Sequence, residues 1–144
     1  EDGELCMHGD SIMLGYYKDP EATAEVIDAD GWFHTGDLAR KDEDGYYFLT
    51  GRKKNLIILD SGENVSPEEL EGIVGKCEAV KECVVKEMGK KIGVVVYCDE
   101  DKQQQVRDFI TEANRTLPLY KRMSAVEFST EPLPRNGAGK LLRQ

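Results

Sequence analysis

A glycine-rich segment near the C-terminus ends in a lysine that could contact an anion. Residues 133–140 read L-P-R-N-G-A-G-K. A P-loop would need glycine where Pro134 stands and serine or threonine where Leu141 stands, so this segment is not a P-loop. Lys140 belongs to a basic tail, because residues 117–144 carry five basic and two acidic side chains. Such a tail suits one anionic ligand such as a phosphate, and a solvated charged terminus is the alternative.

Three further segments carry polar side chains at spacings that could serve a site. Residues 35–37 read T-G-D, a common turn whose aspartate could accept charge-assisted bonds from two vicinal hydroxyls. Residues 51–54 read G-R-K-K, and residues 60–64 read D-S-G-E-N. A solvated basic turn is the simplest interpretation of the first of these two segments, and the glycine of the second would permit close backbone approach.

The elements that must position these segments follow from hydrophobic spacing and turn residues. Asp19 followed by Pro20 predicts a helix start, and Ser66 with Glu69 predicts a capping box. Residues 42–45, D-E-D-G, predict a hairpin turn. The sequence predicts strands at 4–8, 11–14, 38–40, 46–49, 56–59, 82–87, 92–98 and 123–128, and helices at 22–27, 67–76 and 101–116.

This order of elements predicts an α+β fold. After residue 54 it runs strand, helix, strand, strand, helix, strand, which suits a small domain with helices on a mainly antiparallel sheet. Residues 1–50 add strands that cannot close a core alone, so we expect them to belong to a neighbouring sheet or barrel. The first residues read as an entrance to a strand inside a longer protein, without the pattern of a signal peptide.

Composition narrows the class of protein. Of 144 residues, 40% are hydrophobic and 33% charged, with a net charge of −9. This charge argues against nucleic-acid binding, and no apolar run is long enough for a membrane span. The four cysteines form no C-x-x-C pair and the two histidines look isolated, so we expect no metal site. Reduced, part-buried cysteines are typical of a cytoplasmic protein.

Several motifs in a fixed order resemble the adenylate-forming enzymes, which include acyl-CoA synthetases, luciferases and peptide-synthetase adenylation domains. The motifs G-E-L at 3–5, G-Y-Y at 15–17, P-E-A-T at 20–23 and T-G-D at 35–37 come first. The basic turn at 51–54 and the loop at 60–64 follow, and the segment ending at Lys140 resembles the C-terminal P-x-x-x-x-G-K loop of the family. The resemblance is weak between Cys77 and Thr116.

The resemblance implies a role for each candidate residue. Asp37 would accept the ribose hydroxyls of ATP and Arg52 would help to hold the ribose. Lys54 would be the hinge on which a mobile C-terminal domain turns. Lys140 would be catalytic and would bridge the acyl carboxylate and the α-phosphate. The loop residues that would approach CoA are Ser61, Gly62 and Glu63.

The resemblance also implies a domain organisation. Residues 1–51 would be the β-rich C-terminal end of a large N-terminal adenylation domain, residues 52–55 the hinge, and residues 56–144 the mobile domain. The rest of the large domain, in cis, would bind most of the ATP and Mg²⁺. The 144-residue chain alone is therefore expected to be inactive.

The implied function is that of an AMP-forming, ATP-dependent acid–thiol ligase that activates a carboxylic acid, in particular a fatty acid, and transfers it to CoA. Activation of an amino or aryl acid for a carrier protein is one alternative. A non-catalytic interaction or regulatory module is another. A lysine acetyltransferase that modifies Lys140 would fit either view, because acylation removes the charge.

Overall fold

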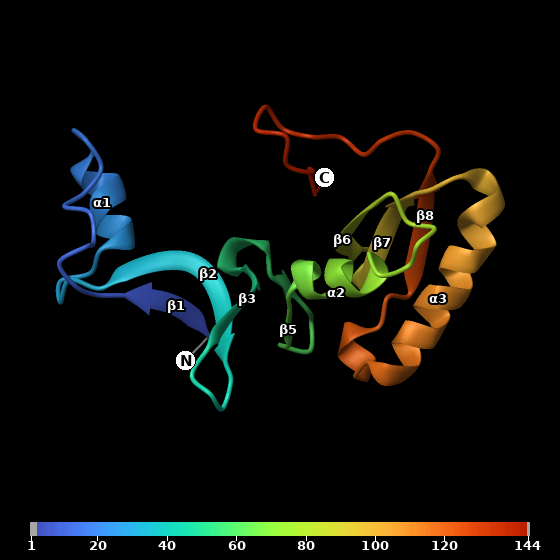
Figure 1. The fold of residues 1–144 in the computed structure, drawn as a ribbon, viewed down its shortest axis with the longest axis horizontal. Helices are drawn as coiled ribbons and strands as arrows, with labels where there is room; N and C mark the ends of the chain where they lie inside the picture. The colour runs from blue at the N-terminus through green and yellow to red at the C-terminus, as the bar shows by residue number, and fades with distance from the viewer. Residues whose placement is uncertain (1–2, 144) are drawn as a thin grey trace. The chain divides into compact units, whose positions relative to one another are not determined.

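The computed structural model describes residues 3–143 (Figure 1). The chain forms two compact units, the first ending at Lys54 and the second beginning at Asn55. Each unit has its own sheet, and each is described separately below.

The first unit is a three-stranded antiparallel sheet with one short helix. Strand β1 (Glu4–Met7) pairs with β2 (Phe33–Lys41), and β2 pairs with β3 (Tyr47–Arg52). Helix α1 (Pro20–Val26) lies in the connection between β1 and β2. The predicted hairpin is present, and both of its strands are longer than expected.

The residues next to the start of α1 correctly predicted where this helix begins, but the strand predicted before it, at 11–14, is absent. The Asp19 carboxylate accepts a hydrogen bond from the Ala22 amide at 3.0 Å, and Pro20 is the first helical residue, as predicted. The strand predicted at 11–14 was wrong. The chain turns there instead, with the Ile12 amide bonded to the Gly9 carbonyl at 3.1 Å. A segment of four residues with three apolar side chains fits a strand or an irregular turn equally well, and only a partner strand would decide between them.

The first unit buries little apolar surface of its own. Among residues 3–54, Leu38 is the hydrophobic side chain that falls in the buried class. The aromatic side chains of Tyr46, Tyr47 and Phe48 on and before β3 are 69%, 60% and 44% exposed. A sheet this open is stable only when its apolar side chains pack against additional protein.

The second unit contains a short two-stranded ladder, two helices and a three-stranded sheet. Its elements are β4 (Ile57–Ile58), β5 (Asn64–Val65), α2 (Pro67–Val74), β6 (Glu82–Met88), β7 (Lys91–Tyr97), α3 (Gln103–Thr116) and β8 (Ala125–Ser129). Short 3₁₀ turns lie at Lys53–Asn55, Glu100–Lys102 and Leu119–Lys121. The α+β prediction is confirmed.

The core of the second unit lies between its two helices and one face of the sheet. The sheet order is β6-β7-β8, antiparallel between β6 and β7 and parallel between β7 and β8. Every other strand pairing in residues 3–143 is antiparallel. The parallel pair is possible because α3 carries the chain back across the sheet (Figure 1). Fully buried side chains from each layer meet in one cluster: Leu70, Val74, Val94, Val96, Val106 and Ile110.

The start of α2 differs from the predicted capping box. Ser66 is the N-cap residue, but its side chain makes no capping bond, and its hydroxyl lies 3.1 Å from a Glu68 carboxylate oxygen. The Glu69 carboxylate accepts both of its bonds from Lys121 Nζ, at 2.9 and 2.7 Å. The carboxylate expected to cap the helix is drawn to a tertiary partner because an ammonium group offers a stronger, charge-assisted bond.

The four cysteines are free thiols, and Cys77 and Cys98 are buried. Burial raises the pKa of Cys83 to about 11, so this thiol stays protonated at neutral pH. None of the helices in residues 3–143 has the length and apolar character needed to cross a membrane.

Candidate functional site

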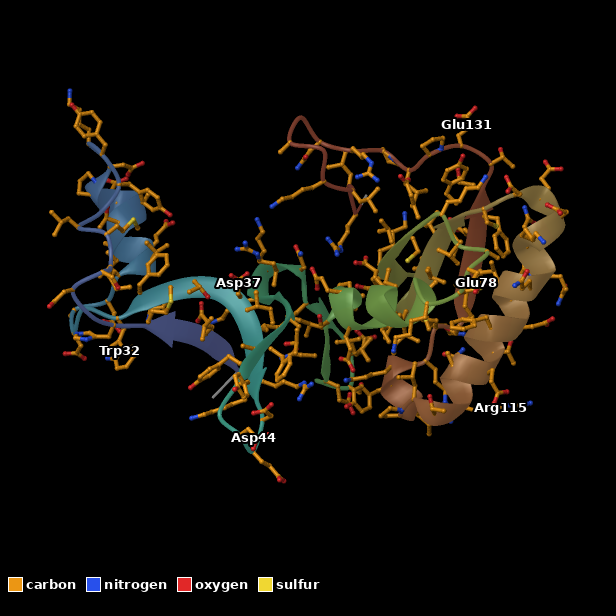
Figure 2. All side chains as sticks on the ribbon, viewed as in Figure 1. Trp32, Asp37, Asp44, Glu78, Arg115 and Glu131 are labelled. Carbon is orange, nitrogen blue, oxygen red and sulfur yellow. The ribbon has the colours of Figure 1, made fainter. Side chains whose placement is uncertain are left out.

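Asp37 and Arg52, the two residues predicted to hold a nucleotide, form an ion pair in the first unit. They are register partners on β2 and β3, and Arg52 Nε lies 2.7 Å from Asp37 Oδ1. Asp37 lies within the sheet, away from the hairpin tip that carries Asp44 (Figure 2). The Asp37 side chain is 26% exposed. A carboxylate offers about four acceptor positions, so this one retains capacity for vicinal hydroxyls.

Hydrogen bonds from Thr35 and Gly36 hold the part of β2 that precedes Asp37. The Thr35 hydroxyl donates to the Leu5 carbonyl at 2.7 Å and accepts from the Asp37 amide at 3.0 Å. Gly36 has φ +70°, a conformation that a residue with a Cβ rarely adopts. Its amide donates to Glu4 Oε1 at 3.0 Å. These bonds therefore fix the backbone of β2 that carries the Asp37 side chain.

His34 is not isolated, and that expectation was wrong. Its Nδ1 lies 3.2 Å from Glu4 Oε2 and 3.5 Å from Cys6 Sγ, and its Nε2 lies 3.3 Å from Asp28 Oδ2. The hydrogen bond to Glu4, and then that to Asp28, raise the pKa of His34 above its ordinary value of 6.5. Strand register creates this cluster, because Cys6 and His34 face each other across β1 and β2.

Glu4, Cys6 and His34 present ligand atoms within 4.8 Å of one another, the arrangement of a metal site with three ligands. The Glu4 carboxylate already has a cationic partner, however, because Lys53 Nζ lies 2.9 Å from Oε2. The hydrogen bond from Lys53 leads the interactions that lower the pKa of Glu4. The cluster is therefore accounted for as an ion-pair network that joins β1, β2 and the 3₁₀ turn after β3.

Lys54, the predicted hinge residue, is exposed and lies in the 3₁₀ turn Lys53–Asn55. The boundary between the two compact units falls directly after it. On one side, Lys53 is paired with Glu4. On the other side, the Asn55 amide group donates to Glu68 Oε1 at 2.6 Å. Both neighbours of Lys54 are thus bonded within their own unit.

The loop with Ser61, Gly62 and Glu63 connects β4 to β5. The Gly62 amide bonds the Leu59 carbonyl at 2.8 Å, and the Leu59 amide bonds the Glu63 carbonyl at 3.0 Å. Gly62 has φ +93°, and a Cβ built there would meet no atom within 4 Å. The Ser61 hydroxyl bonds the Glu63 carboxylate. The loop is exposed, so its backbone is accessible to a ligand.

Lys140 lies on a closed turn of the second unit, with its side chain exposed. The Asn136 side-chain oxygen accepts from the Ala138 amide at 3.0 Å and the Lys140 amide at 2.9 Å. The Asn136 amide donates to the Lys140 carbonyl at 2.8 Å. The turn is closed further by the Leu142 amide, which bonds the Pro134 carbonyl at 2.9 Å. These bonds order the backbone and leave the ammonium group available to an anion.

The structure thus joins Asp37 with Arg52 in the first unit, while Lys140 and the loop 61–63 belong to separate segments of the second. Sequence reasoning missed the partners that hold these residues. Glu4 was noted only as part of G-E-L, although an acid inside a predicted strand is a signal of a buried ion pair. Arg135 and Arg143, which flank Lys140, were counted only as charges.

The comparisons with known proteins agree over the whole chain. Residues 54–144 match the family described as AMP-binding enzyme C-terminal domain. A long-chain-fatty-acid–CoA ligase of Salmonella typhimurium is 42% identical over 100% of this chain and 26% of its own length. A probable 4-coumarate–CoA ligase of Dictyostelium discoideum is 38% identical over 100% of this chain and 27% of its own length.

Solved structures give the same result. The A domain of a carboxylic acid reductase from Segniliparus rugosus, in complex with AMP and a carboxylic acid, is 29% identical with a TM-score of 0.81. The match covers 98% of this chain and 25% of the reductase chain. O-succinylbenzoate coenzyme A synthetase from Bacillus subtilis, in complex with ATP and magnesium ion, is 28% identical with a TM-score of 0.78. The match covers 97% of this chain and 29% of the synthetase chain.

The chain spans about a quarter of the length of the curated relatives it matches. Its family match covers most of its residues, and its second unit has the helix-on-sheet fold of these neighbours. The chain belongs to the AMP-binding, adenylate-forming enzyme family, with residues 54–144 as its AMP-binding enzyme C-terminal domain.

Proposed function

We propose that the full-length protein is an ATP-dependent, AMP-forming acyl-CoA ligase that acts on a fatty acid. Relatives named as long-chain-fatty-acid–CoA ligases, 38 to 42% identical across this chain, support this substrate class. The carboxylate would attack the α-phosphorus of ATP, releasing pyrophosphate and leaving an acyl-adenylate. The CoA thiol would then attack the acyl carbon, releasing AMP and forming the thioester.

The observation that carries this proposal is the placement of Lys140. Its ammonium group is exposed, and the backbone amide of Lys140 is bonded to Asn136, so the backbone that carries this side chain is ordered before any substrate arrives. A cation carried by an ordered turn would stabilise negative charge that develops as the carboxylate and the α-phosphate join. Lys140 is therefore our catalytic residue for adenylate formation.

Asp37 and Arg52 would hold the nucleotide. Arg52 fixes one Asp37 oxygen at 2.7 Å, which orients the carboxylate, and vicinal ribose hydroxyls are the donors that suit its remaining acceptor positions. The Thr35–Gly36 part of β2 fits this group because its hydrogen bonds fix the backbone of Asp37. Mg²⁺ and the phosphates would be held mainly by the rest of the large domain.

We assign residues 1–51 to the large domain, 52–55 to the hinge and 56–144 to the mobile domain. A mobile domain answers a physical requirement, because one rigid site cannot complement two different transition states. Lys54 would absorb the rotation. In the second pose, Lys140 would withdraw and the exposed loop with Ser61, Gly62 and Glu63 would approach CoA.

The exposed aromatic side chains of the first unit support a large domain in cis, because they need an apolar partner. A cytoplasmic location fits the four free thiols, which persist in a reducing compartment. Activation of an aryl or amino acid for a carrier protein is the second candidate. It is favoured by the likeness to an A-PCP didomain of a carboxylic acid reductase, at a TM-score of 0.78.

The test separates the two half-reactions in the full-length protein. Lys140→Ala should lower pyrophosphate exchange into ATP by about 10²- to 10³-fold and largely spare thioester formation from supplied acyl-adenylate. Lys76→Ala, which removes an exposed lysine elsewhere in the second unit, should leave both rates at the parent value. Equal loss of both half-reactions in Lys140→Ala would overturn the proposal. A screen of fatty, aryl and amino acids with CoA or a carrier protein decides between the two candidates.

A further inference from the structure

Two arginines flank Lys140 in sequence, and each is bound to carboxylates elsewhere in the second unit. Arg135 precedes Lys140 and Arg143 follows it. The segment between them has no secondary structure beyond a single bridge between Arg135 and Leu141, so its own hydrogen bonds do not attach it to the domain. The arginines supply that attachment.

Arg135 attaches the first end of the segment to β6. Its Nη2 lies 2.6 Å from Glu82 Oε1, and its Nη1 donates to the Gly139 carbonyl at 2.7 Å. The other Glu82 oxygen accepts from the Leu133 amide at 2.7 Å. One carboxylate therefore holds both a side chain and the backbone at the start of the turn. Arg135, and then the Leu133 amide, lower the pKa of Glu82, so this carboxylate stays ionised at neutral pH.

Arg143 attaches the second end to α2. Its Nη2 lies 2.7 Å from Glu71 Oε2 and 3.2 Å from Glu68 Oε1. Glu71 is itself fixed, because its Oε1 accepts the Val85 amide of β6 at 2.9 Å. The Arg143, Glu68 and Glu71 side chains are 28%, 27% and 18% exposed. Within residues 3–143 the Nε of Arg143 is buried without a hydrogen-bond partner, so the carboxylates account for the hold on this guanidinium.

Arg143, Glu68 and Glu71 form a cluster, called the Arg143 cluster below, and its partial burial strengthens the effect of its ion pairs on stability. Burial raises the pKa of Glu71. Burial acts in the same direction on Glu68, but the bond from Asn55 and the charge of Arg143 lower its pKa on balance. Exposed ion pairs such as Arg115 with Glu112 contribute little, whereas removal of one partner from a largely buried pair leaves an uncompensated charge. The Arg143 cluster is closer to the second case.

The same cluster reaches the boundary of the unit. Glu68 Oε1, which lies near Arg143, also accepts the side-chain amide of Asn55 at 2.6 Å. Asn55 is the first residue of the second unit and follows Lys54. A continuous set of bonds therefore runs from the proposed hinge through Glu68 and Arg143 to the segment that carries Lys140.

We propose that Arg143, held by Glu68 and Glu71, is a positioning residue that fixes the Lys140 turn to the second unit and to Asn55, the residue after Lys54. Arg135 on Glu82 serves the same purpose at the other end. Lys140 then moves with the second unit as one body, and rotation at the hinge alone delivers or withdraws its ammonium group. This inference rests on the proposed function of Lys140 in adenylate formation.

The test uses Arg143→Gln in the full-length protein and measures both half-reactions. A displacement of about 1 Å at a reacting group costs on the order of 10²-fold in rate, so pyrophosphate exchange should fall by about 10- to 100-fold. Thioester formation from supplied acyl-adenylate should change by less than about threefold, because Lys140 is not used there. Arg143→Lys should recover part of the loss, since it keeps the positive charge and loses the planar guanidinium group that places Nη2 between the two carboxylates.

Glu69→Gln is the matched control. It also removes an ion pair from α2, to Lys121, without contacting the segment of Lys140, and should leave both half-reactions unchanged. Amide hydrogen exchange gives a readout independent of activity: residues 136–142 should exchange faster in Arg143→Gln than in Glu69→Gln. If Arg143→Gln fails to fold, Arg135→Gln takes its place, because that side chain is 46% exposed, and the same split is expected.

The inference is overturned if the arginine variants leave pyrophosphate exchange at the parent rate, or if both half-reactions fall equally. It is also overturned if amide hydrogen exchange at residues 136–142 is as slow in the arginine variants as in Glu69→Gln. Failure of the proposed function has a different signature, namely normal pyrophosphate exchange in Lys140→Ala. In that case the hydrogen-exchange comparison still decides whether the arginines anchor the segment.

Discussion

Arg52 and Asp37 face each other across β2 and β3, with Nε and Oδ1 2.7 Å apart. The pair lies next to a bulge in the ladder between Leu38 and Ala39. A bulge adds local twist and re-aims the side chains around it, and such irregularities gather beside active sites. Because the two side chains bond each other, replacing either one should also change the orientation of the other.

Replacing Asp37 tests its assignment to the nucleotide. Asp37→Asn keeps the shape and removes the charge, so charge-assisted bonds worth about 1.5–3 kcal/mol become neutral ones or are lost. AMP binding to the full-length protein should weaken by about 10- to 100-fold in isothermal titration calorimetry. Glu43→Gln, an exposed acid of the same hairpin, should bind AMP like the parent. Unchanged affinity in Asp37→Asn would remove Asp37 from the nucleotide site.

Backbone freedom at Lys54 is required if the second unit rotates. Lys54→Pro fixes φ near −65° and disfavours helical dihedrals at the preceding residue. The rate of one half-reaction, adenylate or thioester formation, should therefore fall by at least about tenfold relative to the other, because the second unit can then reach only one of its two poses. Lys54→Gly removes the same side chain and leaves the backbone free, so it should retain the parent ratio of the two rates. The hinge assignment fails if the proline variant also keeps that ratio.

Gly62 is predicted to serve CoA through its lack of a side chain. Gly62→Ala places a Cβ in the left-handed region, at a cost of about 1–2 kcal/mol in the free energy of unfolding. Gly89→Ala is a matched control, because Gly89 also has positive φ, at +57°, and open space around its Cα. Both variants should lose similar stability in thermal denaturation. Thioester formation should fall only in Gly62→Ala, and an equal fall in both variants would argue against a CoA contact.

The pH response of the first unit should depend on His34. The pKa of its ring is raised above 6.5 by Glu4 and then Asp28, so the folded state favours the protonated ring. Its contribution to stability is therefore complete below about pH 6.5 and is lost as pH rises through the raised pKa. The ring resonances in an NMR titration should report a midpoint above 6.5, assigned with the aid of His8→Gln.

Glu4→Gln is the comparison for that titration. It removes the leading interaction, so the midpoint of His34 should move down toward the ordinary histidine value. A midpoint in the parent protein at or below 6.5 would contradict the ion-pair network. So would a midpoint that stays in place when Glu4 is neutralised.

Local elements were largely predictable because their signals lie within a few residues of one another. Asp19 and Pro20 start α1 as expected, and the helix predicted at 101–116 ends at Thr116 as expected. Val106 and Ile110, four positions apart and therefore on one face of a helix, are the buried residues of α3. The capping box at Ser66 failed because Lys121, far along the chain, takes the Glu69 carboxylate.

The sequence by itself determined the α+β class, the family and the candidate residues Asp37, Arg52 and Lys140, because each depends on residue types at short, fixed spacings. Only the tertiary structure decided which groups support them. Glu4 reaches Lys53 across 49 positions, and Arg143 reaches Glu71 across 72. Such pairs depend on the path by which the chain returns, which is set by strand register and helix packing. Charge counts along the chain carry no information about that path.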